Sequence, residues 1–173
     1  MDGTTTASVA RRRQRAARAL ALADASRLAA HWASWPDAPQ VEYLRGPEAG
    51  LVMVQGRIGG SGDRFNLGEA TVTRATAVLH GGGLLAERVG TSYVLGSDPE
   101  HAGLAAIFDA LLIDPATAPR VMSDVVEPLE REQADDDARS RAQARATQVS
   151  FFTVARENTA ARENTSGTED DDE

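Results

Sequence analysis

The chain has 173 residues, of which 42% are hydrophobic, and its formal net charge is −8 at pH 7. This length suits a single domain that buries a core without disulfide or metal staples. The sequence has no cysteine, which excludes disulfides, thiolate zinc sites, cysteine-ligated iron–sulfur clusters and cysteine nucleophiles.

Much of the negative charge lies in the acidic run 169–173, and all 18 basic residues are arginine, which we attribute to codon bias. The three histidines, His31, His80 and His101, lack the spacing of metal ligands, so we expect a metal site to be absent or carboxylate-based. No apolar run is long enough to span a membrane, and the arginine-rich start lacks the apolar segment of a signal peptide. We therefore expect a cytoplasmic protein that binds neither membrane nor nucleic acid.

The N-terminal composition predicts one helix from Ala10 to about Ala33, because alanine, arginine and leucine dominate this segment. Pro36 then marks its end. Residues 1–9 show no apolar period, and we expect them to be disordered. The arginines at the helix start form either a solvated end or a patch for an acidic partner.

Four segments predict strands: Val41–Leu44, Leu51–Arg57, Glu69–Leu79 and Leu84–Leu95. Leu51–Arg57 is apolar on both faces at first, which favours a strand that leaves a buried sheet and ends at its edge. The three glycines at 81–83 favour an antiparallel hairpin between the last two strands.

Two further helices follow. Ser97 and Glu100 have the spacing of a capping box, and helical apolar spacing continues to about residue 113, which predicts a helix at about 98–113 that packs on the sheet. A second helix is expected from Ala118 to about Ala146, interrupted or kinked at Pro128.

The predicted fold class is α+β: a single domain over 10–157, mainly antiparallel sheet, with an N-terminal helix and a C-terminal helical arm at about 118–157. Residues 158–173 read as a disordered acidic tail. Within the arm, Phe151 and Phe152 would be costly to leave in water, so they enter either the chain's own core or a partner.

The loop between the second and third strands is the candidate binding site, with Arg57, Gly59, Gly60, Gly62, Asp63 and Arg64 as its candidate residues. Its glycine amides could turn toward an anion while the two arginines clamp it. Alternatively, it is a strand connection whose glycines supply positive φ and whose Arg57 pairs with Asp63 or Glu69. It matches neither the phosphate-binding P-loop nor the dinucleotide fingerprint. No catalytic pair of nucleophile and base is evident from spacing.

Three blocks in this order resemble the PhnG family, the G subunit of the carbon–phosphorus lyase system: GLVMVQGRIGGSGDRFNLGEATVTRA, SYVLGSDPEHAGLAAIFDALL and VSFFTVAR. The resemblance covers about Leu20 to Glu157. The segment Gly81–Thr91 is longer than in the family, and the ARENT repeat of the tail departs from it.

The resemblance implies an accessory subunit that works with the H, I and J subunits and the L protein in phosphonate catabolism. The complex replaces adenine on ATP by methylphosphonate, giving α-D-ribose 1-methylphosphonate 5-triphosphate. It implies that this subunit binds no cofactor, that ATP is a substrate of the complex, and that no catalytic residue can be carried over. Under this resemblance Phe151 and Phe152 become candidate interface residues, and the loop arginines could hold a partner's carboxylates as readily as a phosphate.

Overall fold

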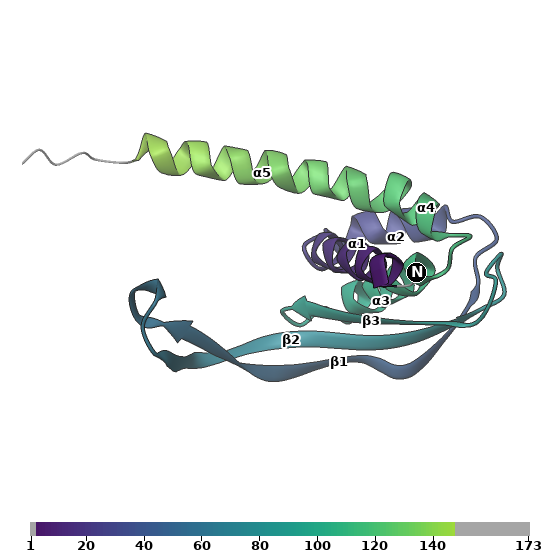
Figure 1. Cartoon of the computed structure of the whole chain (residues 1–173), viewed down its shortest axis with the longest axis horizontal. Helices are drawn as coiled ribbons and strands as arrows, with labels where there is room; N and C mark the ends of the chain where they lie inside the picture. Colours follow the sequence, from purple (N-terminus) through teal and green to yellow (C-terminus); the bar gives the residue numbers. More distant parts are fainter. Residues whose placement is uncertain (1–2, 148–173) are drawn as a thin grey trace, which may run out of the picture.

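The structure is a computed structural model that describes the backbone of residues 3–147 and the side chains of residues 10–147. A three-stranded sheet forms one side of the domain and the longer helices lie on its other side (Figure 1). The elements are α1 (Gly3–Ala21), α2 (Ala25–Ala33), β1 (Gln40–Arg57), η1 (Ile58–Gly60), β2 (Arg64–His80), β3 (Arg88–Leu95), α3 (Pro99–Ile113), α4 (Ala118–Arg120), η2 (Val121–Val126) and α5 (Glu127–Ala146). This arrangement confirms the predicted α+β fold class.

The sheet has the order β1-β2-β3, and both neighbouring pairs are antiparallel, as predicted for the last pair. The two strands expected at Val41–Leu44 and Leu51–Arg57 are in fact the single long strand β1. Register shifts between Tyr43 and Glu48 carry the chain past the Gly46–Pro47 dipeptide. Bulges of this kind tolerate a proline, which cannot donate to a regular ladder.

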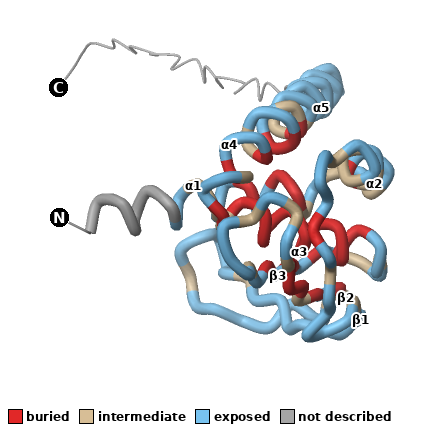
Figure 2. Tube along the Cα trace, turned by 90° about the vertical axis from the view of Figure 1, so that its right-hand side faces the viewer, coloured by how far each residue is buried: buried red, intermediate tan, exposed pale blue. Residues whose placement is uncertain are grey.

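Helix α3 is the centre of the core. Every residue from His101 to Leu112 is buried, because the sheet covers one side of the helix and α1, α2 and α4 cover the other (Figure 2). β3 approaches α3 so closely at Gly90 that an added Cβ would lie 2.0 Å from the carbonyl oxygen of Ala106. Trp32 and Trp35 pack edge-on against Phe108. The prediction that this helix packs on the sheet is confirmed, although it is enclosed rather than amphipathic.

The N-terminal segment differs from the single helix expected over 10–33. Helix α1 begins at Gly3, within the segment expected to be disordered, and a separate helix α2 follows. Asp24 separates them, because its carboxylate accepts a hydrogen bond from the Ser26 N–H at 2.8 Å. Aspartate is a weak residue in a helix interior and a strong N-cap, so the chain stops and restarts there.

The cap of α3 lies one residue later than predicted. The carboxylate of Asp98 accepts from the His101 N–H at 2.9 Å, so Asp98, not Ser97, is the N-cap. Pro99 occupies the first helical turn, where its missing donor has no partner to lose. The predicted capping box of Ser97 and Glu100 is therefore wrong, although the helix itself is confirmed.

The C-terminal helix is interrupted near Pro128, as predicted. The π-helical turn η2 directly precedes α5, whose first turn contains Pro128. A proline lacks the N–H and its ring clashes with the carbonyl four residues earlier, and the wider π turn accommodates both effects. Leu129 is buried, whereas nearly all of α5 beyond it is exposed (Figure 2).

Two N-terminal arginines have partners within the chain, which neither sequence interpretation anticipated. Arg13 pairs with Asp109 of α3, and Arg15 pairs with Glu130 of α5. The side-chain amide of Gln133 adds a hydrogen bond to the Ala19 carbonyl at 2.9 Å. The contacts of Arg15 and Gln133 fasten the base of α5 to α1, and the Arg13 pair fastens α1 to α3.

Candidate functional site

The candidate loop is the tip of a long hairpin formed by β1 and β2. Within it, Gly59 and Gly60 have φ values of 59° and 81°, in the left-handed region that glycine adopts without steric cost. The amides of Ser61 and Gly62 both donate to the Ile58 carbonyl oxygen, the latter at 2.8 Å. These two amides therefore close the turn and do not face an anion.

The two loop arginines lie directly opposite each other, because Arg57 and Arg64 are Cα partners in the β1–β2 ladder. Arg57 donates from Nη1 to the Gly62 carbonyl at 3.1 Å. The expected pairing of Arg57 with Asp63 or Glu69 is not formed, since the guanidinium reaches back to the loop backbone instead.

Across residues 10–147, neither Arg57 nor Arg64 has an ion-pair partner. The two side chains border a shallow depression together with Gln55 and Gly56. Like charges on directly opposed strand positions destabilise a hairpin. A carboxylate or phosphate placed between the two guanidinium groups would relieve that repulsion.

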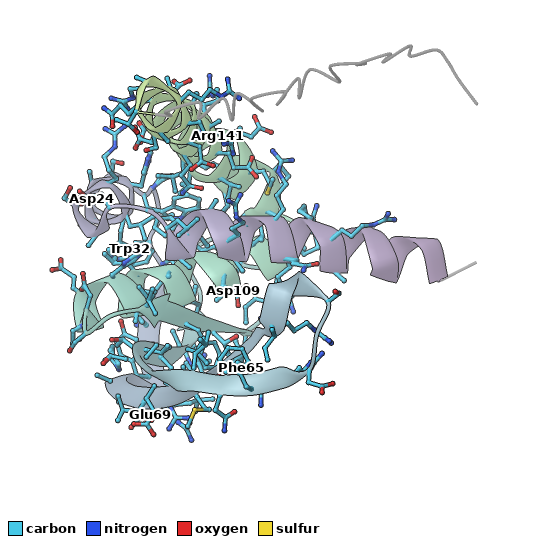
Figure 3. The ribbon with its side chains drawn as sticks, turned by 90° about the vertical axis from the view of Figure 1, so that its left-hand side faces the viewer. Asp24, Trp32, Phe65, Glu69, Asp109 and Arg141 are labelled. Atoms are coloured by element: carbon cyan, nitrogen blue, oxygen red, sulfur yellow. The ribbon has the colours of Figure 1, made fainter. Side chains whose placement is uncertain are left out.

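The hairpin extends beyond the rest of the sheet (Figure 1). β3 ends at Leu95, which pairs with Val72, so among the strands that the structure describes the part of β2 from Arg64 to Ala70 pairs with β1 alone. We call residues 51–70 the distal hairpin. Its large apolar side chains are exposed: Leu51, Val52, Met53, Val54, Ile58, Phe65 and Leu67. The expectation that the strand leaves a buried sheet is wrong here, because no layer of the described chain covers this ribbon; Figure 3 labels Phe65 and Glu69 on it.

Two buried carboxylates that sequence reasoning missed are used for the fold. Asp109 accepts from Nε and Nη2 of Arg13, at 2.8 and 2.6 Å, and from the Thr91 N–H at 2.8 Å. It thus joins α1, α3 and β3. An aspartate inside an otherwise apolar helix was the sequence signal that could have identified it, because a buried carboxylate requires partners.

Asp114 plays a similar part at the end of α3. It accepts from the N–H groups of Leu85 and Ala116 and from the Arg88 guanidinium, at 2.9 to 3.0 Å. Burial by itself would raise the pKa of Asp114, but these hydrogen bonds and the charge of Arg88 outweigh burial and lower its pKa below the ordinary value. The carboxylate therefore stays ionised and holds the loop before β3.

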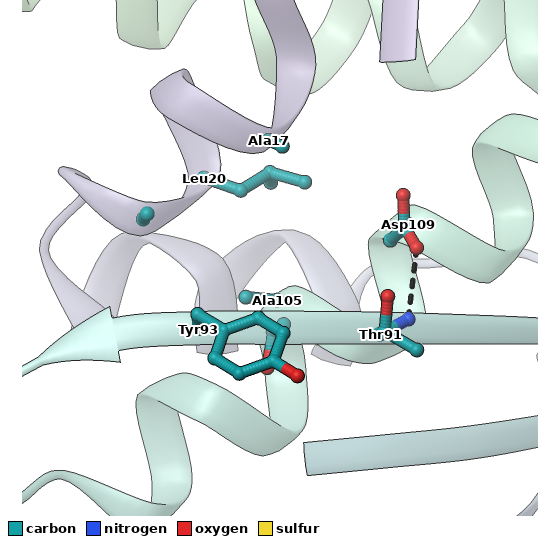
Figure 4. A pocket seen from close by; sticks show the side chains of 8 residues that line it. Ala17, Leu20, Thr91, Tyr93, Ala105 and Asp109 are labelled. Atoms are coloured by element: carbon teal, nitrogen blue, oxygen red, sulfur yellow. Dashed lines mark hydrogen bonds between the residues drawn. The ribbon is translucent and has the colours of Figure 1, made fainter. Parts of the chain in front are cut away.

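A small pocket of about 120 Å³ lies beside Asp109, between α1, α3 and β3 (Figure 4). Ala17, Leu20, Ala105 and Tyr93 line most of it. Its volume is below the several hundred Å³ of a typical ligand site. The Asp109 carboxylate already accepts hydrogen bonds from Arg13 and Thr91, so it is not free to act as an acid or base in this pocket.

The serine and histidine candidates do not form a catalytic pair. The Ser92 hydroxyl donates to the Ala102 carbonyl at 2.6 Å, and Nε2 of buried His101 lies 2.7 Å from the Leu20 carbonyl oxygen. His80 lies between the carboxylates of Glu42 and Glu87, at 3.8 and 3.3 Å. These contacts join elements of the fold.

The described part of the chain contains no group of three or more histidine, aspartate or glutamate residues that could hold a metal ion. Its helices are also too short or too polar to cross a membrane. The interface candidates Phe151 and Phe152 lie outside the described residues, beyond the end of α5 at Ala146.

Comparison with known proteins identifies the family. The family model described as "Phosphonate metabolism protein PhnG" matches residues 11–157. The chain is also 45% identical over 159 residues to "Alpha-D-ribose 1-methylphosphonate 5-triphosphate synthase subunit PhnG" of Rhizobium meliloti (strain 1021), covering 90% of this chain and 97% of the relative. A match of this extent spans every element of the structure from α2 to α5. The chain belongs to the PhnG family of phosphonate metabolism proteins.

Proposed function

We propose that this chain is an accessory subunit of α-D-ribose 1-methylphosphonate 5-triphosphate synthase, the complex that replaces the adenine of ATP by methylphosphonate in phosphonate catabolism. The observation that carries this proposal is the 45% identity to a named subunit of that synthase, over nearly the full length of both chains. The transferase activity belongs to the complex, and the isolated chain is not an independent catalyst.

The use of the buried polar groups supports a structural role. Asp109, Asp114 and His101 each make hydrogen bonds that join separate elements. A catalytic acid or base must instead be within hydrogen-bond reach of a substrate proton. These groups are committed to the fold, so chemistry in the complex is expected to come from other subunits.

We propose the H, I and J subunits and the L protein as partners, acting in the cytoplasm where ATP is available. This subunit would bind no cofactor of its own, and ATP would be a substrate of the whole complex. Phe151 and Phe152, which follow the exposed helix α5, would contact a partner subunit.

Reconstitution tests the proposal. Purified H, I and L proteins are mixed with ATP and methylphosphonate, with and without this chain, and released adenine is quantified by chromatography. Adenine release should require this chain, and the chain alone should release none. Full activity without it, or activity of the single protein, would overturn the proposal.

The opposed arginines favour one alternative, a stand-alone anion- or nucleotide-binding module that uses Arg57 and Arg64. Titration calorimetry of the isolated protein with ATP and with methylphosphonate tests it. Heat that disappears in the Arg57→Gln/Arg64→Gln variant would support this alternative. The absence of heat with both ligands would reject it.

A further inference from the structure

The distal hairpin, residues 51–70, lacks the support that the rest of the sheet receives. β3 pairs with β2 only from Val72 to Leu79, and helix α3 covers the sheet over that same region. The distal hairpin is therefore a two-stranded ribbon that projects from the domain (Figure 1). Isolated two-stranded ribbons are marginally stable in water.

The two faces of the distal hairpin differ in polarity. Leu51 and Met53 alternate along β1 with Val52 and Val54, and all four are exposed. The distal hairpin carries half of the large hydrophobic side chains that are exposed in the described part of the chain. Leu51 and Met53 share their face with Glu69 and the tip arginines, whereas Val52 and Val54 share the other face with Phe65 and Leu67. An exposed apolar face of this kind marks a surface that is covered in the assembled protein.

The tip adds a charge requirement to this apolar surface. Arg57 and Arg64 face each other across the ladder, and no carboxylate among residues 10–147 pairs with either. A second copy of the chain placed tip to tip would bring four guanidinium groups together. The complementary occupant is instead a different chain that supplies carboxylates at this point.

We propose that the distal hairpin inserts into an apolar groove on another subunit of the synthase, where acidic side chains of that subunit bind Arg57 and Arg64. This inference rests on the proposed function and assigns it a contact surface. The apolar face, together with Leu51 and Met53 of the mixed face, supplies the buried area, and the arginines fix how far the hairpin enters the groove.

Co-purification with the H, I and J subunits tests the inference. The tagged chain is co-expressed with these three subunits, and the captured amount of each is measured for wild type and variants. The apolar variant is Leu51→Ser/Met53→Ser, and the charge variant is Arg57→Glu/Arg64→Glu. The matched control is Leu85→Ser. Leu85 is 70% exposed, close to the 66% of Leu51, but it lies before β3 and outside the distal hairpin.

We expect both hairpin variants to reduce capture at least tenfold, while Leu85→Ser captures as much as wild type. All variants should keep the wild-type unfolding temperature, because every substituted side chain is exposed. Amide exchange over residues 51–57 and 64–70 should be fast in the isolated chain and slow in the complex.

Other outcomes separate this inference from the proposed function. Wild-type capture by both hairpin variants, or equal loss with Leu85→Ser, would overturn the hairpin as the contact surface while leaving the subunit role intact. Failure of the wild-type chain to capture any subunit would overturn the subunit role as well. A homodimer of the isolated chain that the hairpin variants dissociate would identify a second copy as the occupant and would refute the inference.

Discussion

Removal of the Asp109 carboxylate should destabilise the domain more than any single surface ion pair does. This carboxylate joins three elements, since it accepts two hydrogen bonds from Arg13 of α1 and one from Thr91 of β3. The variant Asp109→Ala deletes all three at once. It leaves the Arg13 guanidinium without its partner and the Thr91 N–H without its acceptor.

The magnitude follows from burial. A hydrogen bond to a charged group contributes about 1.5–3 kcal/mol, but Arg13 regains water when its partner is removed. The Arg13 side chain is 42% exposed, whereas that of Asp109 is only 4% exposed. Counting each bond at about half its value gives a loss of about 2–4 kcal/mol in the free energy of unfolding. For a domain of this size that corresponds to a decrease in Tm of roughly 4–16 °C.

Urea unfolding followed by circular dichroism measures the loss, with Glu130→Ala as the control. Glu130 pairs with Arg15 at the surface, where the two side chains are 27% and 54% exposed, so its removal should cost no more than about 1 kcal/mol. A double-mutant cycle with Arg13→Ala isolates the pair itself. If Asp109→Ala costs no more than Glu130→Ala, or if the cycle shows no coupling, the buried carboxylate does not hold these elements together.

Three further changes test other parts of the fold. Gly90→Ala should lower the free energy of unfolding by about 3 kcal/mol or more, measured by thermal unfolding, because the new methyl group would lie 2.0 Å from a backbone atom of α3. The control Gly50→Ala should change it by no more than about 0.5 kcal/mol, because no atom lies within 4 Å of the added Cβ. The lowered pKa of Asp114 means that its contribution is complete above the pKa of an unfolded carboxyl and is lost as pH falls through the folded value. The unfolding free energy of Asp114→Asn should therefore depend less on pH in acid than that of wild type. Asp98→Ala should lower the free energy of unfolding by about 1 kcal/mol, and Ser97→Ala should lower it by less than about 0.5 kcal/mol. A larger loss for Ser97→Ala than for Asp98→Ala would show that Ser97 is the N-cap, as the predicted capping box required.

Sequence periodicity correctly predicted the elements of this fold that have a regular backbone. Glu69–Leu79 was correctly predicted to be a strand, and the alternate residues Thr73, Ala75, Ala77 and Leu79 within it are buried. The apolar spacing after Pro99 correctly predicted α3. Both patterns record a local repeat of the backbone, which needs no knowledge of distant residues.

The errors involve interactions that a local pattern does not contain. The partner of Asp109 is 96 residues away, so no spacing rule joins Arg13 to it. The break between α1 and α2 depended on whether Asp24 would be solvated inside one helix or would cap a second helix. In the structure Asp24 caps α2, and Leu20 and Leu28 on either side of it both lie in the core.

The distal hairpin shows most clearly where sequence and single-chain structure diverge. The apolar run at Leu51–Val54 predicted burial, but the structure leaves these side chains in water. The seven apolar side chains of the hairpin are each 39–69% exposed. Burying the exposed part would contribute roughly 5–10 kcal/mol, at about half of 1.5–3 kcal/mol each, which is comparable to the whole stability of a typical domain. Exposure on that scale is consistent with a chain whose relative is named as a synthase subunit. On our proposal the covering surface belongs to another chain, and the apolar pattern then reports burial in the assembled complex, not within this chain.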